Sequence, residues 1–371
     1  MVAGLIAMAL LAGSGESTIG AVPAAEPVRL TVAASGDFLI HEPVWERARA
    51  DSGRRRYDFR PMLRFIRPIV RAADLALCHA ETPMSRRRPS GYPRFNTPRP
   101  LARAIDWAGY DVCSTASNHS LDQGQRGIRT TRKALRRAGV ARTGSFSSAA
   151  QRKRSTILTA KGVKVAFLSY TEMTNGIPLP HPWSVNLARA RRILADARRA
   201  RRRGARVVIV NVHWGDEYRS APSRFQRRLA RRLTRTGTVT AVVGQHAHVV
   251  QPIKRVNGRL VVFGEGNLVS NQTAACCPRA TQDGLVARLR ITVGPGKAKV
   301  SGVDYVPTWV RHPDYAVLPV GLGLRRDLAP RRTLRASRRR TVAVAGRRRG
   351  VRPVSGVRRR NGRDRAAASP R

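Results

Sequence analysis

The spacing of apolar and polar positions in the first part of the chain predicts strands that alternate with helices. Residues from Val28 to Ala34 alternate with the period of a strand, and the stretch from Phe59 to Ala73 carries apolar residues at helical spacing. Gly109 is a suitable end for the helix before it, because glycine readily adopts the left-handed conformation that closes helices. The further strands expected here are 74–78 and 111–116, and the further helices are 99–109 and 123–139.

The second part of the chain continues this alternation and adds hairpins. Lys161-Gly162 and Asn257-Gly258 each stand between two apolar runs, and an Asn-Gly pair in that position is a strong hairpin signal. The strands expected here are 155–159, 163–170, 206–212, 239–244, 249–256, 260–263, 284–293 and 299–307, and the helices are 186–203 and 223–236. This pattern predicts an α/β domain over residues 28–310, built on a mixed sheet or on two stacked sheets.

The two ends of the chain differ from this middle part. Val2 to Ala12 is a short apolar run, and the small residues of Ala21-Val-Pro-Ala-Ala25 suit signal-peptide cleavage, so residues 1–25 resemble a secretory signal without its positive region. We therefore expect an extracytoplasmic protein, secreted or attached to the cell surface; the alternative is a disordered N-terminus on a cytoplasmic protein. Apolar periodicity fails after Pro319, so residues 311–371 are predicted to form an Arg-rich, mostly disordered tail.

The charge of the chain is strongly positive, with 71 Lys and Arg against 22 Asp and Glu and a formal net charge of +49. The excess is spread along the whole chain and is not confined to the C-terminal segment. Such a field attracts polyanions, including nucleic acid, anionic lipid surfaces and acidic polymers. Aromatic residues make up only 5% and none interleaves with the arginine clusters near the C-terminus, which argues against specific nucleic-acid recognition.

The four cysteines are too few for a disulfide framework in a chain of 371 residues. Cys78 and Cys113 fall in predicted interior strands, where we expect them to be small core residues. Cys276 and Cys277 are adjacent in a predicted loop. No C-x-x-C occurs, so a thiolate zinc site is not expected.

Polar residues of metal-ligand type follow the predicted strands. In an α/β sheet, ligands collect in the crevice at the carboxyl ends of the strands, so side chains released there can meet. The residues at these positions are Asp37 with His41, His79 with Glu81, Asn118 with His119 and Asp122, His213 with Glu217, His246 with His248, and Glu265 with Asn267.

Imidazoles and carboxylates combined with an amide oxygen suit one or two divalent ions of manganese, zinc or iron. A bridging carboxylate such as Glu81 or Asp37 would let two metals sit about 3.5–4 Å apart, the spacing used in two-metal phosphoryl chemistry. His119, outside the first shell of ligands, is placed to protonate a leaving group.

Each candidate also has an ordinary structural explanation. A histidine such as His213 at the end of an apolar strand is more often a hydrogen-bonded rim residue than a ligand. Asp37 equally suits a turn or a helix N-cap, and Glu81 a solvated loop. Asn118 equally suits an Asx turn, and Asp122 a helix N-cap. No functional role is expected for His41, His79, His181 and His312, with His41 the least certain of these.

The polar motifs together resemble the bacterial capsule-synthesis CapA family, also called poly-γ-glutamate biosynthesis proteins, which looks like a divergent branch of the calcineurin-like metallophosphoesterases. The resemblance covers roughly 28–310, and its motifs occur in the family's order. They are Gly36-Asp37, Glu81-Thr-Pro83, Ser117-Asn-His-Ser-Leu-Asp122, His213-Trp-Gly-Asp-Glu-Tyr218, Gly244-Gln-His-Ala-His-Val-Val-Gln-Pro252 and Gly264-Glu-Gly-Asn267.

The resemblance implies a four-layer αββα sandwich with a dimetal cleft. It also implies that His119 is the catalytic acid. Asp122 is a further catalytic candidate from its position after His119. The ligands that it implies are Asp37, Glu81, Asn118, His213, His246 and His248.

The chain departs from the phosphoesterase pattern at two of these motifs. Phe38 and Leu39 follow Asp37, so the D-x-H of active phosphoesterases is missing and one ligand is absent unless His41 replaces it. Glu81 stands in place of the usual Asp arrangement, and His79-Ala80 occurs where the CapA pattern usually has Asn-Leu.

The function expected from these features is synthesis, export or trimming of an anionic capsule polymer, with poly-γ-glutamate as the expected polymer. A metal cleft in this protein would be capable of phosphoester-type hydrolysis. The alternative is a non-catalytic accessory that binds the polymer or its synthase complex. The Arg-rich C-terminal segment is expected to bind anionic lipid or cell-wall polymer.

Overall fold

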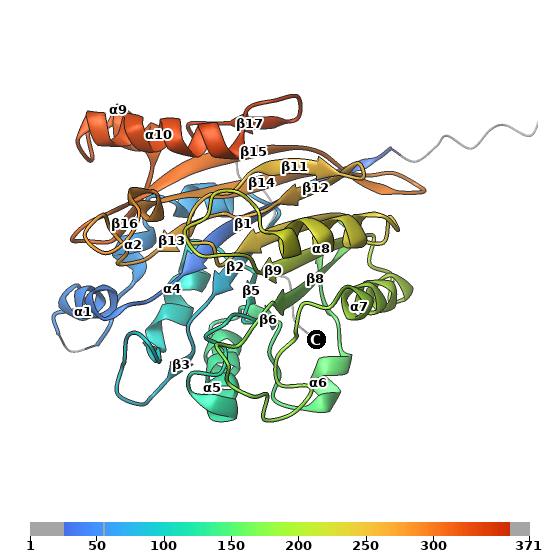
Figure 1. The fold of residues 1–371 in the computed structure, drawn as a ribbon, viewed down its shortest axis with the longest axis horizontal. Coiled ribbons are helices and arrows are strands. Elements are labelled where there is room, and N and C mark those ends of the chain that lie inside the picture. Colours follow the sequence, from blue (N-terminus) through green and yellow to red (C-terminus); the bar gives the residue numbers. More distant parts are fainter. Residues whose placement is uncertain (1–25, 55, 357–371) are drawn as a thin grey trace, which may run out of the picture.

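The computed structural model describes residues 26–54 and 56–356, in which two β-sheets lie against each other between layers of helices (Figure 1). The larger sheet contains parallel and antiparallel strand pairs. Its strands, in spatial order, are β16 (Ala316–Pro319), β15 (Ala298–Arg311), β14 (Asp283–Val293), β1 (Val28–Phe38), β2 (Leu75–Ala80), β5 (Val112–Ser114) and β6 (Ala141–Thr143), with β13 (Asn267–Val269) beside β1 and β17 (Val351–Pro353) beside β15.

The second sheet is also mixed. Its strands are β11 (Ile253–Val256), β12 (Arg259–Val262), β10 (Ala241–Gln245), β9 (Val207–His213), β8 (Val163–Thr171) and β7 (Thr156–Ala160). A separate short pair joins β3 (Met84–Ser85) to β4 (Thr97–Pro98). The α/β class with mixed sheets is therefore as the sequence predicts.

Helices cover the outer faces of the two sheets (Figure 1). Those on the larger sheet are α1 (Glu42–Ala50), α2 (Arg60–Leu63), α3 (Arg67–Arg71), α4 (Pro100–Ala108) and α5 (Gly124–Arg137), and those on the second sheet are α7 (Ala190–Arg202) and α8 (Arg224–Thr234). The described residues also form α6 (Ala149–Lys153), the 3₁₀ turn Arg279–Gln282, α9 (Val320–Arg325) and α10 (Arg331–Ala345). None of the helices in the described residues is both long and apolar enough to cross a membrane.

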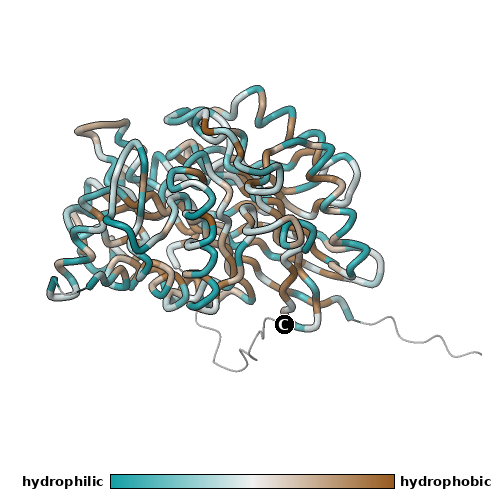
Figure 2. The backbone as a smooth tube through the Cα atoms, turned by 90° about the horizontal axis from the view of Figure 1, so that it is seen from below, coloured by the Kyte–Doolittle hydropathy of each residue, from teal (hydrophilic) through white to brown (hydrophobic). Residues whose placement is uncertain are grey.

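The central strands are apolar on both faces because each face packs against a different layer. In β9, Val207 and Ile209 face the other sheet, whereas Val208 and Val210 pack with the helices outside. Side chains alternate across a strand, so a strand that is covered on both sides is a continuous apolar run and not an alternating one. Figure 2 shows this apolar interior as brown segments inside a mostly hydrophilic outline.

The two predicted hairpin turns are confirmed. Lys161 and Gly162 have φ of 49° and 73°, and Asn257 and Gly258 have φ of 46° and 73°. A tight turn with two consecutive positive φ values matches the twist of antiparallel strands, which is why Asn-Gly and Lys-Gly work here. Gly109 ends α4 in the left-handed conformation, also as predicted.

The prediction of one continuous helix over 59–73 is wrong, because the structure has two short helices there, α2 and α3. Each of them has a proline as its second residue, Pro61 in α2 and Pro68 in α3. Proline lacks the N–H that a helix interior requires and fits best in the first turn, so Pro68 starts a new helix in place of continuing the old one.

The prediction of a mostly disordered tail from residue 311 is wrong for residues up to 356, which form β16, α9, α10 and β17. Helix α10 packs on β14 and β15, where Arg340 pairs with Asp283 at 2.7 Å. Its buried face consists of Leu334, Ser337, Thr341 and Ala345, which are mostly small or polar residues. A search for large apolar residues at helical spacing therefore misses this helix.

Two further expectations concern segments at the chain ends. The signal-like residues 1–25 and the last part of the Arg-rich segment, 357–371, lie outside the described residues. The secretory interpretation of the N-terminus consequently stays a prediction.

Cys78 and Cys113 were expected to be separate core residues, but in the structure they form a disulfide. They are register partners on the neighbouring parallel strands β2 and β5, and both are fully buried. Burial was predicted correctly, whereas the pairing depends on the register of two strands 35 residues apart in the chain. A single sequence does not specify that register.

Candidate metal centre

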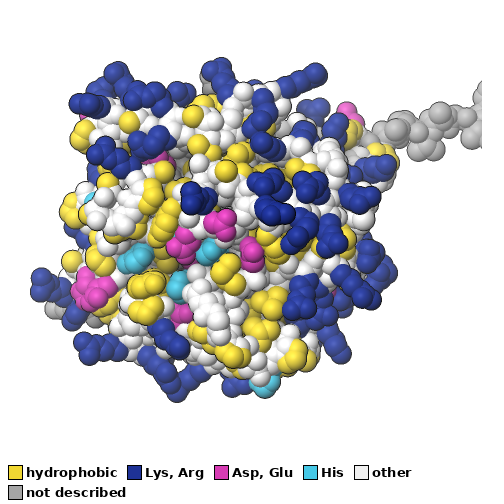
Figure 3. Space-filling model, viewed as in Figure 1, with side chains coloured by type: hydrophobic (Ala, Val, Ile, Leu, Met, Phe, Trp, Pro, Cys, Tyr) yellow, Lys and Arg dark blue, Asp and Glu magenta, His cyan; other side chains and the backbone are white. Residues whose placement is uncertain are grey.

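The polar residues of the predicted motifs meet where strands of both sheets end. Asp37 lies near the end of β1 and His79 near the end of β2, while His213 ends β9 and His246 follows β10. On this side of the molecule, histidine and acidic side chains reach the surface in the middle of the face, and Lys and Arg side chains surround them (Figure 3). The sheet topology therefore brings together residues that are distant in sequence.

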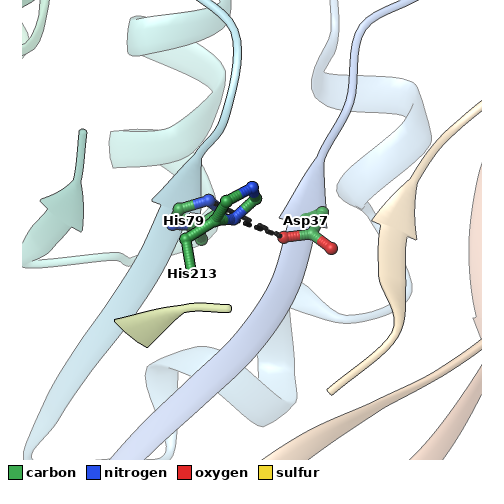
Figure 4. Close-up of side chains that lie close together, drawn as sticks. All are labelled: Asp37, His79 and His213. Atoms are coloured by element: carbon green, nitrogen blue, oxygen red, sulfur yellow. Dashed lines mark ion pairs between the residues drawn. The ribbon is translucent and has the colours of Figure 1, made fainter. Parts of the chain in front are cut away.

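Asp37, His79 and His213 form one cluster, called here the Asp37 group (Figure 4). Asp37 Oδ1 lies 3.7 Å from His79 Nε2 and 4.0 Å from His213 Nδ1. The His79 and His213 rings stack with their centroids 4.7 Å apart. All three side chains are buried, and one ligand atom from each lies within 4.8 Å of the others.

Glu81, His246 and His248 form a second cluster, called here the Glu81 group. It meets the same criterion of 4.8 Å and is also buried. His248 Nε2 lies 3.8 Å from Glu81 Oε1. Each group thus offers one carboxylate and two imidazoles, the donor set that zinc, manganese and iron(II) accept.

The two groups adjoin each other, and Asp37 reaches both. The rings of His213 and His246 lie 4.6 Å apart between centroids. Asp37 Oδ2 lies 3.4 Å from His248 Nδ1, and Glu81 Oε1 lies 3.7 Å from His213 Nε2. Two carboxylates that each face both groups provide the kind of bridge found in two-metal sites.

Several ligand-type atoms of these groups are buried without a hydrogen-bond partner. They are Asp37 Oδ1, both ring nitrogens of His79, both carboxylate oxygens of Glu81, His213 Nδ1 and His246 Nδ1. Leaving a buried polar atom unpaired costs about 1–3 kcal/mol, and native proteins avoid it. So many unpaired donors and acceptors in one place fit a bound cation that would satisfy them together.

The pKa values of the imidazoles favour the neutral form that binds metal. Burial lowers the pKa of His79 to about 4 and that of His246 to about 3. Burial also lowers the pKa of His213 well below its ordinary value. For His248, burial acts in the same direction, but the Glu81 and Asp37 carboxylates outweigh it and raise the pKa to about 10. A metal ion would replace that proton.

Hydrogen bonds from outside the groups orient two of the rings. Asn267 donates through Nδ2 to Gln272 Oε1 at 2.8 Å, so its Oδ1 accepts from His248 Nδ1 at 3.0 Å. His248 Nε2 is then free for a ligand. Asn118 Oδ1 lies 2.8 Å from His213 Nε2, which leaves His213 Nδ1 toward Asp37. Partners of this type fix the tautomer of metal-binding histidines.

His119 and Asp122 lie beside the two groups as a hydrogen-bonded pair. His119 Nδ1 is 2.8 Å from Asp122 Oδ2, and the same oxygen accepts the Phe95 N–H at 2.7 Å. The Phe95 ring packs edge-on against the His119 ring. Asp122 thus holds the imidazole in one orientation through Nδ1 and leaves Nε2 available.

Backbone conformation aims the H-x-H pair. His246 and His248 have φ of 94° and 55°, values that residues with a side chain rarely adopt. The chain turns sharply at both positions, and this directs two imidazoles two residues apart toward the same region. Such strain is characteristic of functional sites, where the surrounding structure maintains it.

The structure brings together the predicted residues Asp37, Glu81, His213, His246 and His248, and places Asn118 against His213. His79, which also belongs to the Asp37 group, was not predicted as a ligand. A usable signal was present, because residues i and i+2 at a strand end face the same side, and Glu81 had already been selected. His41 belongs to neither group; the Asn271 N–H donates to its ring at 3.3 Å.

The fold is that of a known class of phosphoesterases. The calcineurin-like phosphoesterase YfkN from Bacillus subtilis superposes with a TM-score of 0.51 at 15% identity, over 84% of this chain and 99% of that chain. At this identity the comparison shows the fold alone. Together with the two buried His and carboxylate groups, it describes a metallophosphoesterase-like protein.

The chain belongs to the family of bacterial capsule synthesis proteins, PGA_cap, whose sequence pattern matches residues 31–272. It is 26% identical over 282 residues to the capsule biosynthesis protein CapA of Bacillus anthracis, covering 72% of this chain and 67% of that protein. It is 25% identical over 281 residues to the PGA biosynthesis protein CapA of Bacillus subtilis, covering 72% and 70%. The family resemblance seen in the motifs is thereby confirmed.

Proposed function

We propose that this capsule biosynthesis protein is a metal-dependent hydrolase that cleaves a phosphoester-type bond during synthesis, export or trimming of an anionic capsule polymer, with poly-γ-glutamate as the polymer. The observation that carries the proposal is the pair of adjoining buried groups with unpaired ligand atoms. The helix–sheet–sheet–helix layering, which we assign to the metallophosphoesterase type, supports it.

The chain's own residues divide the work between holding ions and positioning the substrate. The Asp37 group and the Glu81 group would each hold one divalent ion, with Asp37 and Glu81 facing both. Bound ions supply Lewis acidity toward a phosphoryl oxygen and toward water. Asn118, the predicted ligand, contacts His213 in this structure and would either orient that ring or coordinate directly.

His119 is the residue that we assign to proton transfer, because its Nε2 is free while Nδ1 is bonded to Asp122. It would protonate the leaving oxygen. We assign Asp122 a positioning role and not a catalytic one, since its carboxylate contacts the His119 ring and the Phe95 N–H.

The test of the hydrolase proposal is turnover of a generic phosphodiester, bis(p-nitrophenyl) phosphate, by protein loaded with manganese or zinc. We expect His119→Ala to lower kcat roughly 10²–10⁴-fold while metal content stays unchanged. His181→Ala, at an exposed histidine outside both groups, is the matched control and should retain full activity. Absence of turnover in metal-loaded wild type would overturn the hydrolase.

A second candidate function is non-catalytic binding of the polymer or its synthase, which the cationic surface around the site favours (Figure 3). Salt screens exposed charges, so this binding should collapse as salt is added. If polymer binding survives both His119→Ala and a chelator in a protein without turnover, the accessory function is the correct one.

We also propose an extracytoplasmic location. The buried Cys78–Cys113 disulfide supports it, because disulfides persist mainly in oxidising compartments. Fractionation of the native host that recovers the protein in the cytoplasm with both thiols reduced would refute this location.

A further inference from the structure

A cavity of about 320 Å³ lies between α5 and the segment that carries β3 and β4, apart from the two ligand groups. None of the described residues that line it is acidic or aromatic. Its cationic side chains are Arg86, Arg87, Arg99, Arg126, Lys133 and Arg137. The cavity, called here the α5 groove, is therefore a concave site of one charge sign.

One wall of the α5 groove is a single helix face. Arg126, Thr130, Lys133 and Arg137 follow each other at intervals of three or four residues, which places them in a row along α5. From Arg126 to Arg137 the row extends along about 16 Å of the helix axis. Such a row suits an extended anionic chain better than a single small anion.

The other wall is fixed to the body of the protein. The Met84 N–H donates to Thr131 Oγ1 at 2.7 Å, which attaches β3 to α5. The Asn96 amide donates to the carbonyls of Arg87 and Arg88 at 3.0 and 2.8 Å. The arginines of this wall are thus mounted on a backbone that is held in place before a ligand binds.

The cations of the α5 groove repel one another. Burial lowers the pKa of Arg99, and the charges of Arg86 and Arg137 lower it further. Elsewhere the protein neutralises a buried arginine with a carboxylate, as in the Arg152–Asp196 pair at 2.6 Å. In the α5 groove no carboxylate among the described lining residues does so, and an anionic ligand would relieve the repulsion.

Both walls of the α5 groove continue directly from the metal centre. Ser85 on one wall is four residues beyond Glu81, and Gln123 on the other directly follows Asp122. The Ser117 hydroxyl donates to the Glu81 carbonyl at 2.6 Å and joins the two motifs at their base. A chain lying along the groove would consequently have one part close to His119 and Asp122.

From this geometry we infer that the α5 groove binds an anionic polyamide with regularly spaced carboxylates, poly-γ-glutamate, and leads it to the metal centre. The choice of polymer rests on the proposed function. Arginine binds carboxylates in bidentate fashion, and Ser85, Gln123 and Thr130 offer hydrogen bonds to amide groups. Absence of aromatic residues from the described lining disfavours single-stranded nucleic acid, whose bases stack on aromatic side chains.

The test measures binding of a fluorescein-labelled γ-linked glutamate decamer to the full chain by anisotropy at fixed ionic strength. The groove variant is Arg126→Ala/Lys133→Ala/Arg137→Ala. The control, Arg191→Ala/Arg192→Ala/Arg198→Ala on α7, removes the same charge from another exposed helix surface. We expect the groove variant to weaken binding roughly tenfold and the control to weaken it less than about twofold.

Equal weakening by both variants would show attraction to the overall charge and overturn the inference. So would a labelled oligothymidylate of equal charge that binds more tightly than the glutamate decamer and depends on the same three residues. Groove-dependent binding in a protein without phosphodiesterase activity would remove the proposed hydrolase and leave the groove assignment intact. Phosphodiester turnover together with equal decamer binding by wild type and the groove variant would overturn the groove assignment and leave the proposed hydrolase intact.

Discussion

At the scale of single residues, the candidate site depends on how closely backbone segments approach one another. Gly36 precedes Asp37 on β1, and a Cβ atom at Gly36 would lie only 1.7 Å from the carbonyl oxygen of Gly266. The Asp37 N–H donates to that same oxygen at 3.0 Å. The glycine therefore lets the two segments meet and sets the position of the Asp37 carboxylate between both ligand groups.

Gly36→Ala should destabilise the fold strongly, since its methyl group would overlap a backbone oxygen that cannot rotate away. We expect a loss of about 2–4 kcal/mol in the free energy of unfolding, measured by urea denaturation. Gly294→Ala is the matched control, because a Cβ there meets nothing within 4 Å and φ is not positive; it should change stability by less than about 0.5 kcal/mol. Equal stability of the two variants would contradict the close-approach explanation.

The sequence predicted most residues of the site because each follows a strand, and strand ends converge. His79 also follows a predicted strand, but it was assigned no functional role because a lone histidine is more often a structural residue than a ligand. The partner of the Asp122 side chain was not predictable for a different reason, because its bond to the His119 ring depends on the path of the loop between them. Residue type and spacing do not specify such side-chain partners.

At the scale of secondary-structure elements, one ion pair connects the two sheets. Asp74, just before β2, accepts from the Thr31 N–H at 2.7 Å and pairs with Lys161 at 2.9 Å. Lys161 lies in the β7–β8 turn of the other sheet and also donates to the Arg29 carbonyl at 2.9 Å. Burial acts to raise the pKa of Asp74, but the bonds from Lys161 and Thr31 outweigh it and lower that pKa.

Asp74→Asn should remove this connection and lower the free energy of unfolding at pH 7 by about 0.5–1 kcal/mol, a modest value because Lys161 is partly exposed. A carboxylate with a lowered pKa stabilises the fold above its ordinary value of 3.8, and the stabilisation disappears as pH falls through the lowered value. Urea denaturation at pH 7 and pH 3 should therefore show the difference between variant and wild type shrinking in acid. A difference that grows in acid would contradict the assignment.

Elements with large apolar residues were predictable, and those with small ones were not. The valine-rich strand β9 is unmistakable because both of its faces are buried. Helix α10 was not predicted because its buried face consists of Ser337, Thr341 and Ala345 with a single leucine. This face is buried because α10 packs on strands that are distant in sequence, and a local sequence pattern does not indicate such packing.

At the scale of the whole molecule, acidic residues are few against a net charge of +49, and two of them lie in the buried ligand groups. Buried Asp37 and Glu81 face four imidazoles, while cations cover the surrounding surface (Figure 3). A positive exterior attracts an anionic polymer, and a buried centre of carboxylates and neutral imidazoles attracts divalent cations. Under the proposed function, polymer attraction and metal binding would therefore occupy separate parts of the protein.

The most direct test of the central claim is the metal content of the full chain after chelation, reloading with manganese or zinc, and removal of excess ion, measured by elemental analysis. We predict about two ions per chain in wild type and in the His181→Ala control. His79→Ala and His246→Ala should each lose about one ion without loss of folding by circular dichroism. A folded wild type that retains no metal, or equal metal content in all four proteins, would contradict the claim that these residues form a metal centre.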